Sequence, residues 1–141
     1  MNTNLSQSLT RKVLPFMALC LTLILGSMPA YAADPVIAGT VAGQAVDDNA
    51  VIKPFALVTV AHSGNVDVRI DLDMTANGIL INLGSFVDNG GGVYETLNQP
   101  PLLVSAQIQG LRFVPTNNQV APGAPDVTTE FTITAADAGG G

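Results

Sequence analysis

Acidic side chains are the most abundant groups in this chain that could do chemistry. The 141 residues include eleven Asp and Glu against five Lys and Arg, with one His and one Cys. Carboxylate oxygens are ligands for calcium, and one calcium ion takes roughly six to eight oxygens. One histidine and one cysteine are too few for a zinc site, which draws its ligands mainly from these two residue types. The acidic balance also excludes a basic nucleic-acid binder.

Three aspartates share one face of a predicted strand. In residues 65–73 the even positions are apolar and the odd positions polar, so Asp67, Asp71 and Asp73 point the same way, with Arg69 between them. Side chains along one strand face are too widely spaced to converge on one ion, because two residues advance a strand by roughly 7 Å. We therefore predict a solvated strand face on which Arg69 offsets part of the repulsion.

The residue types of a serine hydrolase are present without its pattern. His62 is the only histidine, and no nucleophile-elbow motif surrounds Ser63, Ser85 or Ser105, the serines that follow residue 32. His62 stands beside Ser63-Gly64 at the predicted end of a strand, where an exposed turn histidine is the ordinary outcome. A carboxylate pair for glycoside hydrolysis is not excluded by counting acids, but the aromatic residues are more typical of core than of a sugar platform. We predict that the chain is not an enzyme.

The first 32 residues have the pattern of a signal peptide. A cationic start ends at Arg11-Lys12, an apolar run covers residues 13–28, and small residues at Ala30 and Ala32 precede a predicted cleavage before Ala33. The apolar run is short for a membrane span. Cleavage leaves three basic residues against all eleven acidic ones, a net charge of −8, and no cysteine. We expect an exported protein with no membrane span after processing, in the periplasm, at the cell surface or outside the cell. Its charge does not suit binding to anionic lipid or nucleic acid.

Alternating hydrophobicity predicts a mostly β domain over residues 33–135, followed by a Gly-rich tail over 136–141. Apolar residues alternate over 127–135 as they do over 65–73, and an apolar, β-branched run covers 55–61. Shorter candidate strands cover residues 36–38, 41–46, 79–82, 93–96 and 111–114.

Turn residues separate these strands. Asn77-Gly78 predicts a type I′ hairpin, and residues 88–92 predict a second, looser turn that lacks the rest of an EF-hand loop. The prolines in residues 115–125 predict a long loop. Within residues 100–110, Leu103, Ala106 and Gln107 have helical spacing, and this predicts a short helix. About seven short strands in this length predict an all-β fold, a two-sheet antiparallel sandwich with one short helix.

Four segments together resemble a known bacterial module. They are PVIAGTVAGQAVDDNA (residues 35–50), IKPF (52–55), GLRFVPTNNQVAPG (110–123) and TTEFTI (128–133). This pattern is similar to the immunoglobulin-like or cadherin-like modules that occur in tandem in large secreted and surface proteins, including adhesins and hemolysin-type calcium-binding proteins. Members of this family usually carry many copies of the module, whereas this sequence has one copy behind its own predicted signal peptide.

The resemblance implies a function and a candidate metal. Calcium at a boundary between modules would make Asp47, Asp48 and Asp137 candidate ligands, although the full acidic linker motif of cadherins is not present. It implies an exported, non-enzymatic module with a structural, spacer or adhesive role, for which residues 47–50 and 115–125 are the loops of first interest. Its partner would be a protein or a cell surface. The alternative is a small periplasmic protein that binds a cation or a glycan. The oligomeric state stays open.

Overall fold

The computed structural model describes residues 33–139. The predicted signal peptide and its cleavage site therefore lie outside the described residues, as do the last two glycines of the predicted tail.

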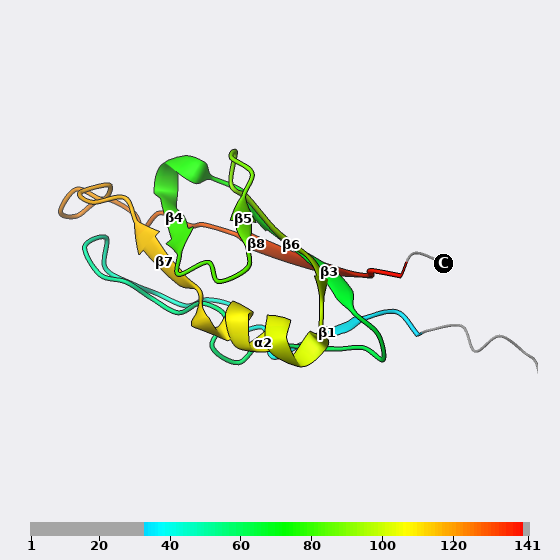
Figure 1. The fold of residues 1–141 in the computed structure, drawn as a ribbon. Coiled ribbons are helices and arrows are strands. Elements are labelled where there is room, and N and C mark those ends of the chain that lie inside the picture. Colours follow the sequence, from blue (N-terminus) through cyan, green and yellow to red (C-terminus); the bar gives the residue numbers. More distant parts are fainter. Residues whose placement is uncertain (1–32, 140–141) are drawn as a thin grey trace, which may run out of the picture. The chain divides into compact units, whose positions relative to one another are not determined.

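Eight strands, one α-helix and one short 3₁₀ helix make up the described chain (Figure 1). All strand pairs are antiparallel, so the mostly β architecture with one short helix agrees with the sequence prediction. The elements are β1 (Val36–Ala38), β2 (Thr59–Ala61), β3 (Val66–Leu72), the 3₁₀ helix (Thr75–Asn77), β4 (Gly78–Ile81), β5 (Val87–Asp88), β6 (Val93–Gln99), α2 (Pro101–Gly110), β7 (Arg112–Pro115) and β8 (Phe131–Asp137).

The strands pair into three hydrogen-bonded sheets. The largest has the order β5-β6-β3-β8, and the pairs β1-β2 and β4-β7 form the other two. An isolated antiparallel bridge between Ile52 and Phe113 adds a further segment beside β7. This arrangement is compatible with a β-sandwich, although three hydrogen-bonded sheets stand where the sequence predicted two. It makes β3 an inner strand of the largest sheet.

The alternation predicted for β3 is confirmed. Val66, Val68, Ile70 and Leu72 are buried, whereas Arg69 is exposed and the aspartates between them are half-buried. Burying one face of β3 fixes its register, because a slip of one residue would move every apolar side chain to the wet face.

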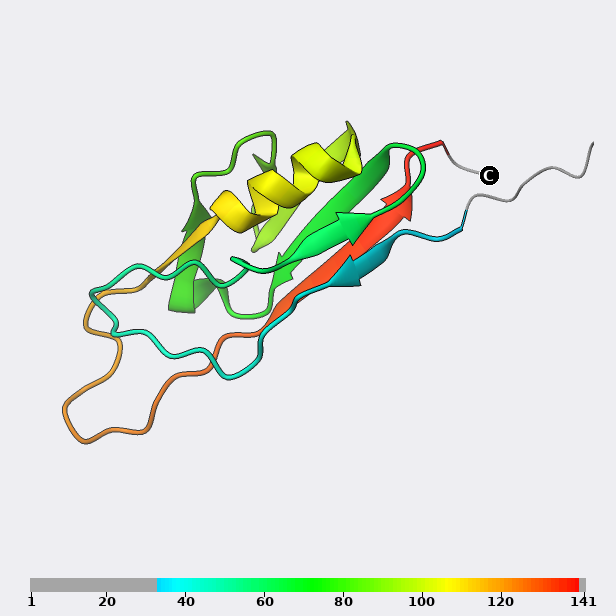
Figure 2. The same ribbon diagram turned by 90° about the horizontal axis from the view of Figure 1, so that it is seen from below.

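The helix α2 and the β1-β2 pair lie over the buried face of the large sheet (Figure 2). The helix buries Val104 and Ile108 in the core. Its Ser105 hydroxyl accepts a hydrogen bond from the backbone nitrogen of Val60 at 2.8 Å and donates one to the Pro101 carbonyl at 2.7 Å. This serine therefore fastens the helix to β2.

The core extends from these layers to the β4-β7 pair. Edge-to-face contacts at centroid distances of 5.2 Å join Phe131 to both Phe55 and Phe113, and the Tyr94 hydroxyl accepts a hydrogen bond from the backbone nitrogen of Leu80 at 3.1 Å. The three sheets thus share one core. It contains Phe55, Val58, Val60, Val66, Val68, Ile70, Leu72, Leu80, Phe86, Tyr94, Val104, Ile108, Leu111 and Phe113.

The predicted hairpin at Asn77-Gly78 is wrong. Asn77 ends the 3₁₀ helix, and β3 and β4 belong to different sheets. Asn77 is buried, and its amide donates hydrogen bonds to Thr128 and Thr129. Gly78 has a φ of 153°, and a Cβ there would lie 2.3 Å from the Val114 carbonyl oxygen. The glycine is therefore needed for close packing against β7 rather than for a hairpin.

Several predicted strand boundaries also differ from the structure. Residues 54–57 form a turn, so only the end of the predicted strand 55–61 is β2, and residues 41–46 form no strand. The last strand begins at Phe131 instead of residue 127, and it runs on to Asp137, inside the predicted tail. In contrast, the loose turn at residues 88–92 does connect two paired strands, and residues 115–125 contain no strand beyond Pro115.

The described chain begins and ends at the same end of this unit. The start of β1 and the finish of β8 lie together in both views, whereas the loops that contain residues 47–50 and 115–125 lie at the opposite end (Figures 1 and 2). A hydrogen bond of 3.4 Å from the Val120 nitrogen to Asp48 Oδ2 links these two loops.

Candidate functional site

The acidic strand face predicted on β3 is held by an ion-pair network. Arg69 donates to both carboxylate oxygens of Asp71, with Nη2 2.6 Å from Oδ1, and its Nη1 lies 2.8 Å from Oε1 of Glu95 on β6. The hydrogen bonds from Arg69 lower the pKa of Asp71 below its ordinary value of 3.8 and raise the pKa of Arg69. Asn89 donates to the second oxygen of Glu95 at 2.7 Å. Arg69 thus offsets part of the repulsion between the carboxylates of this face, as predicted.

Other carboxylates on and beside this sheet accept hydrogen bonds from the backbone. Asp67 Oδ1 accepts from the nitrogen of Asn98 at 2.7 Å, where the register shift between β3 and β6 leaves an extra residue. Asp73 accepts from the nitrogen of Glu130 at 2.8 Å, and Asp88 from that of Gly90 at 2.8 Å. Each of these aspartates satisfies a backbone donor at a bulge, a strand start or a turn.

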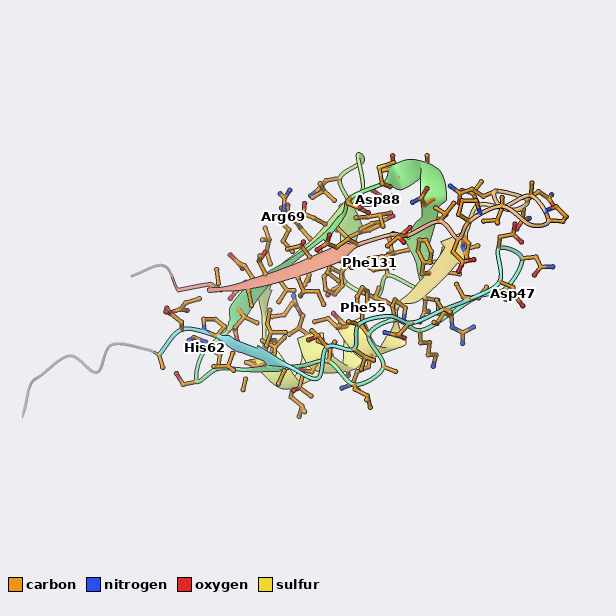
Figure 3. The ribbon with its side chains drawn as sticks, turned by 180° about the vertical axis from the view of Figure 1, so that it is seen from behind. Asp47, Phe55, His62, Arg69, Asp88 and Phe131 are labelled. Carbon is orange, nitrogen blue, oxygen red and sulfur yellow. The ribbon has the colours of Figure 1, made fainter. Side chains whose placement is uncertain are left out.

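The three calcium candidates do not come together. Asp47 and Asp48 lie in the loop before β2, and Asp137 ends β8 at the opposite end of the unit (Figures 2 and 3). Asp137 Oδ1 accepts a hydrogen bond from the nitrogen of Gly139 at 2.9 Å. Between residues 33 and 139, no three His, Cys, Asp or Glu side chains are grouped so that they could hold a metal ion. Calcium at these aspartates stays a prediction, and one ion cannot contact all three within this unit.

His62, Ser85 and Ser105 each make hydrogen bonds with different parts of the fold. His62 lies in the turn after β2, as predicted, but it is half-buried rather than exposed (Figure 3). Its Nδ1 lies 3.2 Å from both the nitrogen and the carbonyl oxygen of Gly64. Ser105 bonds backbone groups of β2 and α2, while Ser85 Oγ lies 2.8 Å from Thr96 Oγ1 and also donates to the side chain of Gln107. Within the described chain, no serine hydrogen-bonds to His62.

An open hollow lies where β5 leaves the edge of β6. It has a volume of about 290 Å³, and its lining includes the polar side chains of Ser85, Asn89, Glu95, Thr96 and Gln99, with Val87 and Leu97 as apolar neighbours. The Ser85-Thr96-Gln107 hydrogen bonds pin its inner wall between β6 and α2. Sequence reasoning missed this hollow, because its residues come from the loop before β5, from β5 and the turn after it, and from β6, and no single motif connects them.

No helix in residues 33–139 is both long enough and apolar enough to cross a membrane.

Comparison with models of known families, with curated proteins and with solved structures found no match to this chain.

Proposed function

We propose that this chain is an exported, non-enzymatic module of the immunoglobulin-like or cadherin-like kind, with an adhesive role at or beyond the cell surface. The observation that carries the proposal is the position of its ends. The described chain enters and leaves at one end, and the loops over residues 47–50 and 115–125 lie at the other (Figure 2). Loops held on a rigid scaffold away from the attachment end are suited to contact a partner.

This geometry favours adhesion over a spacer role. In a spacer domain of an end-to-end array, the N-terminus and the C-terminus lie at opposite ends of the domain. Here a segment that follows β8 would leave the unit beside the start of β1, at the end where the chain enters. A unit joined in this way adds little length to an array but leaves its far end free.

The hydrogen bonds of the reactive side chains support a non-enzymatic role. The aspartates of the β3 face, the Asp88 turn, Ser85 and Ser105 hold parts of the fold together. His62 contacts Gly64 in its own turn through Nδ1, and its buried Nε2 has no hydrogen-bond partner among the described residues. The β1-β2 pair and α2 over the large sheet support a layered, sandwich-like architecture for the module.

Attachment of the protein in two orientations tests the adhesive role. Residues 33–141 lack cysteine, so single cysteines can be introduced as Ser63→Cys, near the chain ends, or as Asn117→Cys, in the far loop. Each exported variant is purified and coupled to beads through its thiol, and bead retention on the producing cells is counted. We expect retention only when coupling is through residue 63, because coupling through residue 117 covers the loops.

Two controls accompany this experiment. The N-terminus of the exported protein is sequenced, and we expect Ala33, as cleavage of the signal peptide requires. Beads coated with an unrelated acidic protein measure background. Retention that is equal in the two orientations, or that never exceeds background, would contradict the adhesive proposal.

The hollow beside β5 supports a second candidate, a small ligand-binding protein. Convergent polar side chains in a concave site favour such a role. Its experiment is a titration with soluble oligosaccharides and divalent cations, followed by amide NMR shifts. Shifts confined to residues 85–89 and 95–99 would favour this candidate over adhesion.

A further inference from the structure

The outer face of the β4-β7 pair has a composition unlike that of the rest of the protein. Ile52 and Phe113 exchange two backbone hydrogen bonds, of 3.1 and 2.8 Å. One residue to either side, this antiparallel register sets Val51 opposite Val114 and Lys53 opposite Arg112. The β4-β7 register continues the two rows, because Ile79 pairs with Val114 and Ile81 with Arg112.

These rows face outward. Leu80 and Phe113 are in the core and Ile52 packs against it, so the neighbours of these residues point to the other side. Ile79 is 54% exposed and Val51 is 51% exposed, and both Lys53 and Arg112 are exposed. We call this surface the outer β4-β7 face. It consists of an aliphatic row, Ile79, Val114 and Val51, beside a mixed row, Ile81, Arg112 and Lys53.

The two basic residues of this face are unusual in an acidic chain. Residues 33–139 contain three basic side chains, and of these only Arg69 makes an ion pair in the structure. Lys53 and Arg112 instead stand side by side. Like charges directly opposite each other on paired strands destabilise a sheet. The fold thus concentrates its unpaired positive charge beside exposed aliphatic side chains, although eleven carboxylates are present in the sequence.

We propose that the outer β4-β7 face docks an extended, acidic segment of a partner protein, whose carboxylates pair with Lys53 and Arg112 and whose aliphatic side chains cover Ile79, Val114 and Val51. Side chains alternate between the two sides of an extended segment, so a segment that runs along the boundary between the two rows directs its aliphatic positions toward one row and its acidic positions toward the other. The inference rests on the proposed adhesive role and deepens it by naming the chemistry of the partner.

Charge complementarity selects this occupant over two others. A second copy docked through the same face would bring two further cations and no carboxylate into the contact. An anionic lipid surface would also face the acidic side chains around these two cations and be repelled by them, whereas a short segment can contact the outer β4-β7 face alone. The face also continues into the far loops, because Val51 follows the loop over residues 47–50 and Val114 precedes the loop over 115–125.

Amide NMR of the exported protein with synthetic peptides tests the proposal. The probe is a peptide of alternating Glu and Val, and the matched peptides carry Gln or Lys in place of Glu. We expect the Glu peptide to shift amides in residues 51–53, 79–81 and 112–114 and the other two peptides to leave them unchanged. Added salt should weaken the shifts, because it screens exposed charges.

Two variants of equal charge provide the control. Arg112→Gln and Arg69→Gln each remove one positive charge, but only Arg112 is on the outer β4-β7 face. We expect R112Q to weaken peptide binding at least fivefold and R69Q to leave it within twofold. Both variants are first checked for an unchanged amide spectrum away from the substitution.

Four outcomes would overturn the proposal. They are no shifts at millimolar Glu peptide, equal binding of the Lys peptide, equal losses in R112Q and R69Q, and shifts on another surface. Self-association in sedimentation that R112Q changes would assign the face to a second copy, and binding to anionic vesicles would assign it to lipid; either result also overturns it. Orientation-dependent bead retention without peptide binding would reject this inference and leave the adhesive role standing.

Discussion

At the scale of single residues, the acidic face of β3 depends on Arg69. Its guanidinium contacts the carboxylates of Asp71 and Glu95, and it lowers the pKa of Asp71 below 3.8. A carboxyl whose pKa is lowered by folding binds protons more weakly in the folded state than in the unfolded state. Its contribution to stability is therefore present above the ordinary pKa and is lost as the pH falls through the lowered one.

We predict that Arg69→Gln returns the pKa of Asp71 toward 3.8. The measurement is a pH titration of the Asp71 carboxyl carbon by NMR, in the exported protein. The stability difference between the two proteins should shrink as the pH falls, because protonated Asp71 gains nothing from Arg69. Arg112→Gln is the control, since it removes the same charge at a distance. An unaltered Asp71 titration in R69Q would mean that the ion pair does not form in solution.

At the scale of elements, the sequence pattern predicts that α2 is a helix, but packing decides which face of the helix is buried. The helical spacing within residues 100–110 correctly predicted a helix. However, the spacing picked out Leu103 and Ala106, which are exposed, whereas the structure buries Val104, Ser105 and Ile108. The helix is apolar on most sides, so periodicity alone does not choose a face, and its contacts with β2 do.

We predict opposite results for two matched truncations in α2. Ile108 is 0% exposed and Leu102 is 85% exposed. Ile108→Ala should lower the free energy of unfolding by about 2–5 kcal/mol, because it leaves a cavity in the core. Leu102→Ala should change it by less than about 0.5 kcal/mol. Urea denaturation measures both values. Equal losses would show that the face containing Leu102 is covered in solution.

The strands likewise include features that the local pattern predicts and features that depend on distant contacts. Strict alternation predicted β3 well, because a half-buried strand in the middle of a sheet has one wet and one dry face along its whole length. The Asn77-Gly78 hairpin failed because short-range turn chemistry takes no account of distant partners. Asn77 bonds Thr128 and Thr129, and Gly78 packs on β7, which lies more than thirty residues on. The outer β4-β7 face also depends on such long-range register.

At the scale of the whole molecule, three sheets share one core. Phe131 on β8 contacts Phe113 on β7, and Tyr94 on β6 bonds the backbone of β4. The β1-β2 pair joins the same core through Val60 and the helix above it. Loss of one sheet would therefore expose apolar surface of the other two. This coupling should make the unit unfold in a single transition, as small domains with one core usually do.

We predict that thermal unfolding of the exported protein gives the same midpoint by two independent probes. Far-UV circular dichroism reports the strands, and near-UV circular dichroism reports Tyr94, which is the only tyrosine after residue 32 and is 2% exposed. Midpoints that differ between the two probes would contradict a single transition.

Amide hydrogen exchange then compares the stability of β4 and β7 with that of β3. We expect the slowest amides of all three strands to exchange with similar free energies. Faster exchange confined to β4 and β7 would make the outer β4-β7 face part of a separate, less stable unit. A partner docked there would then stabilise that unit by binding it, and the Glu-Val peptide should slow its exchange before that of β3.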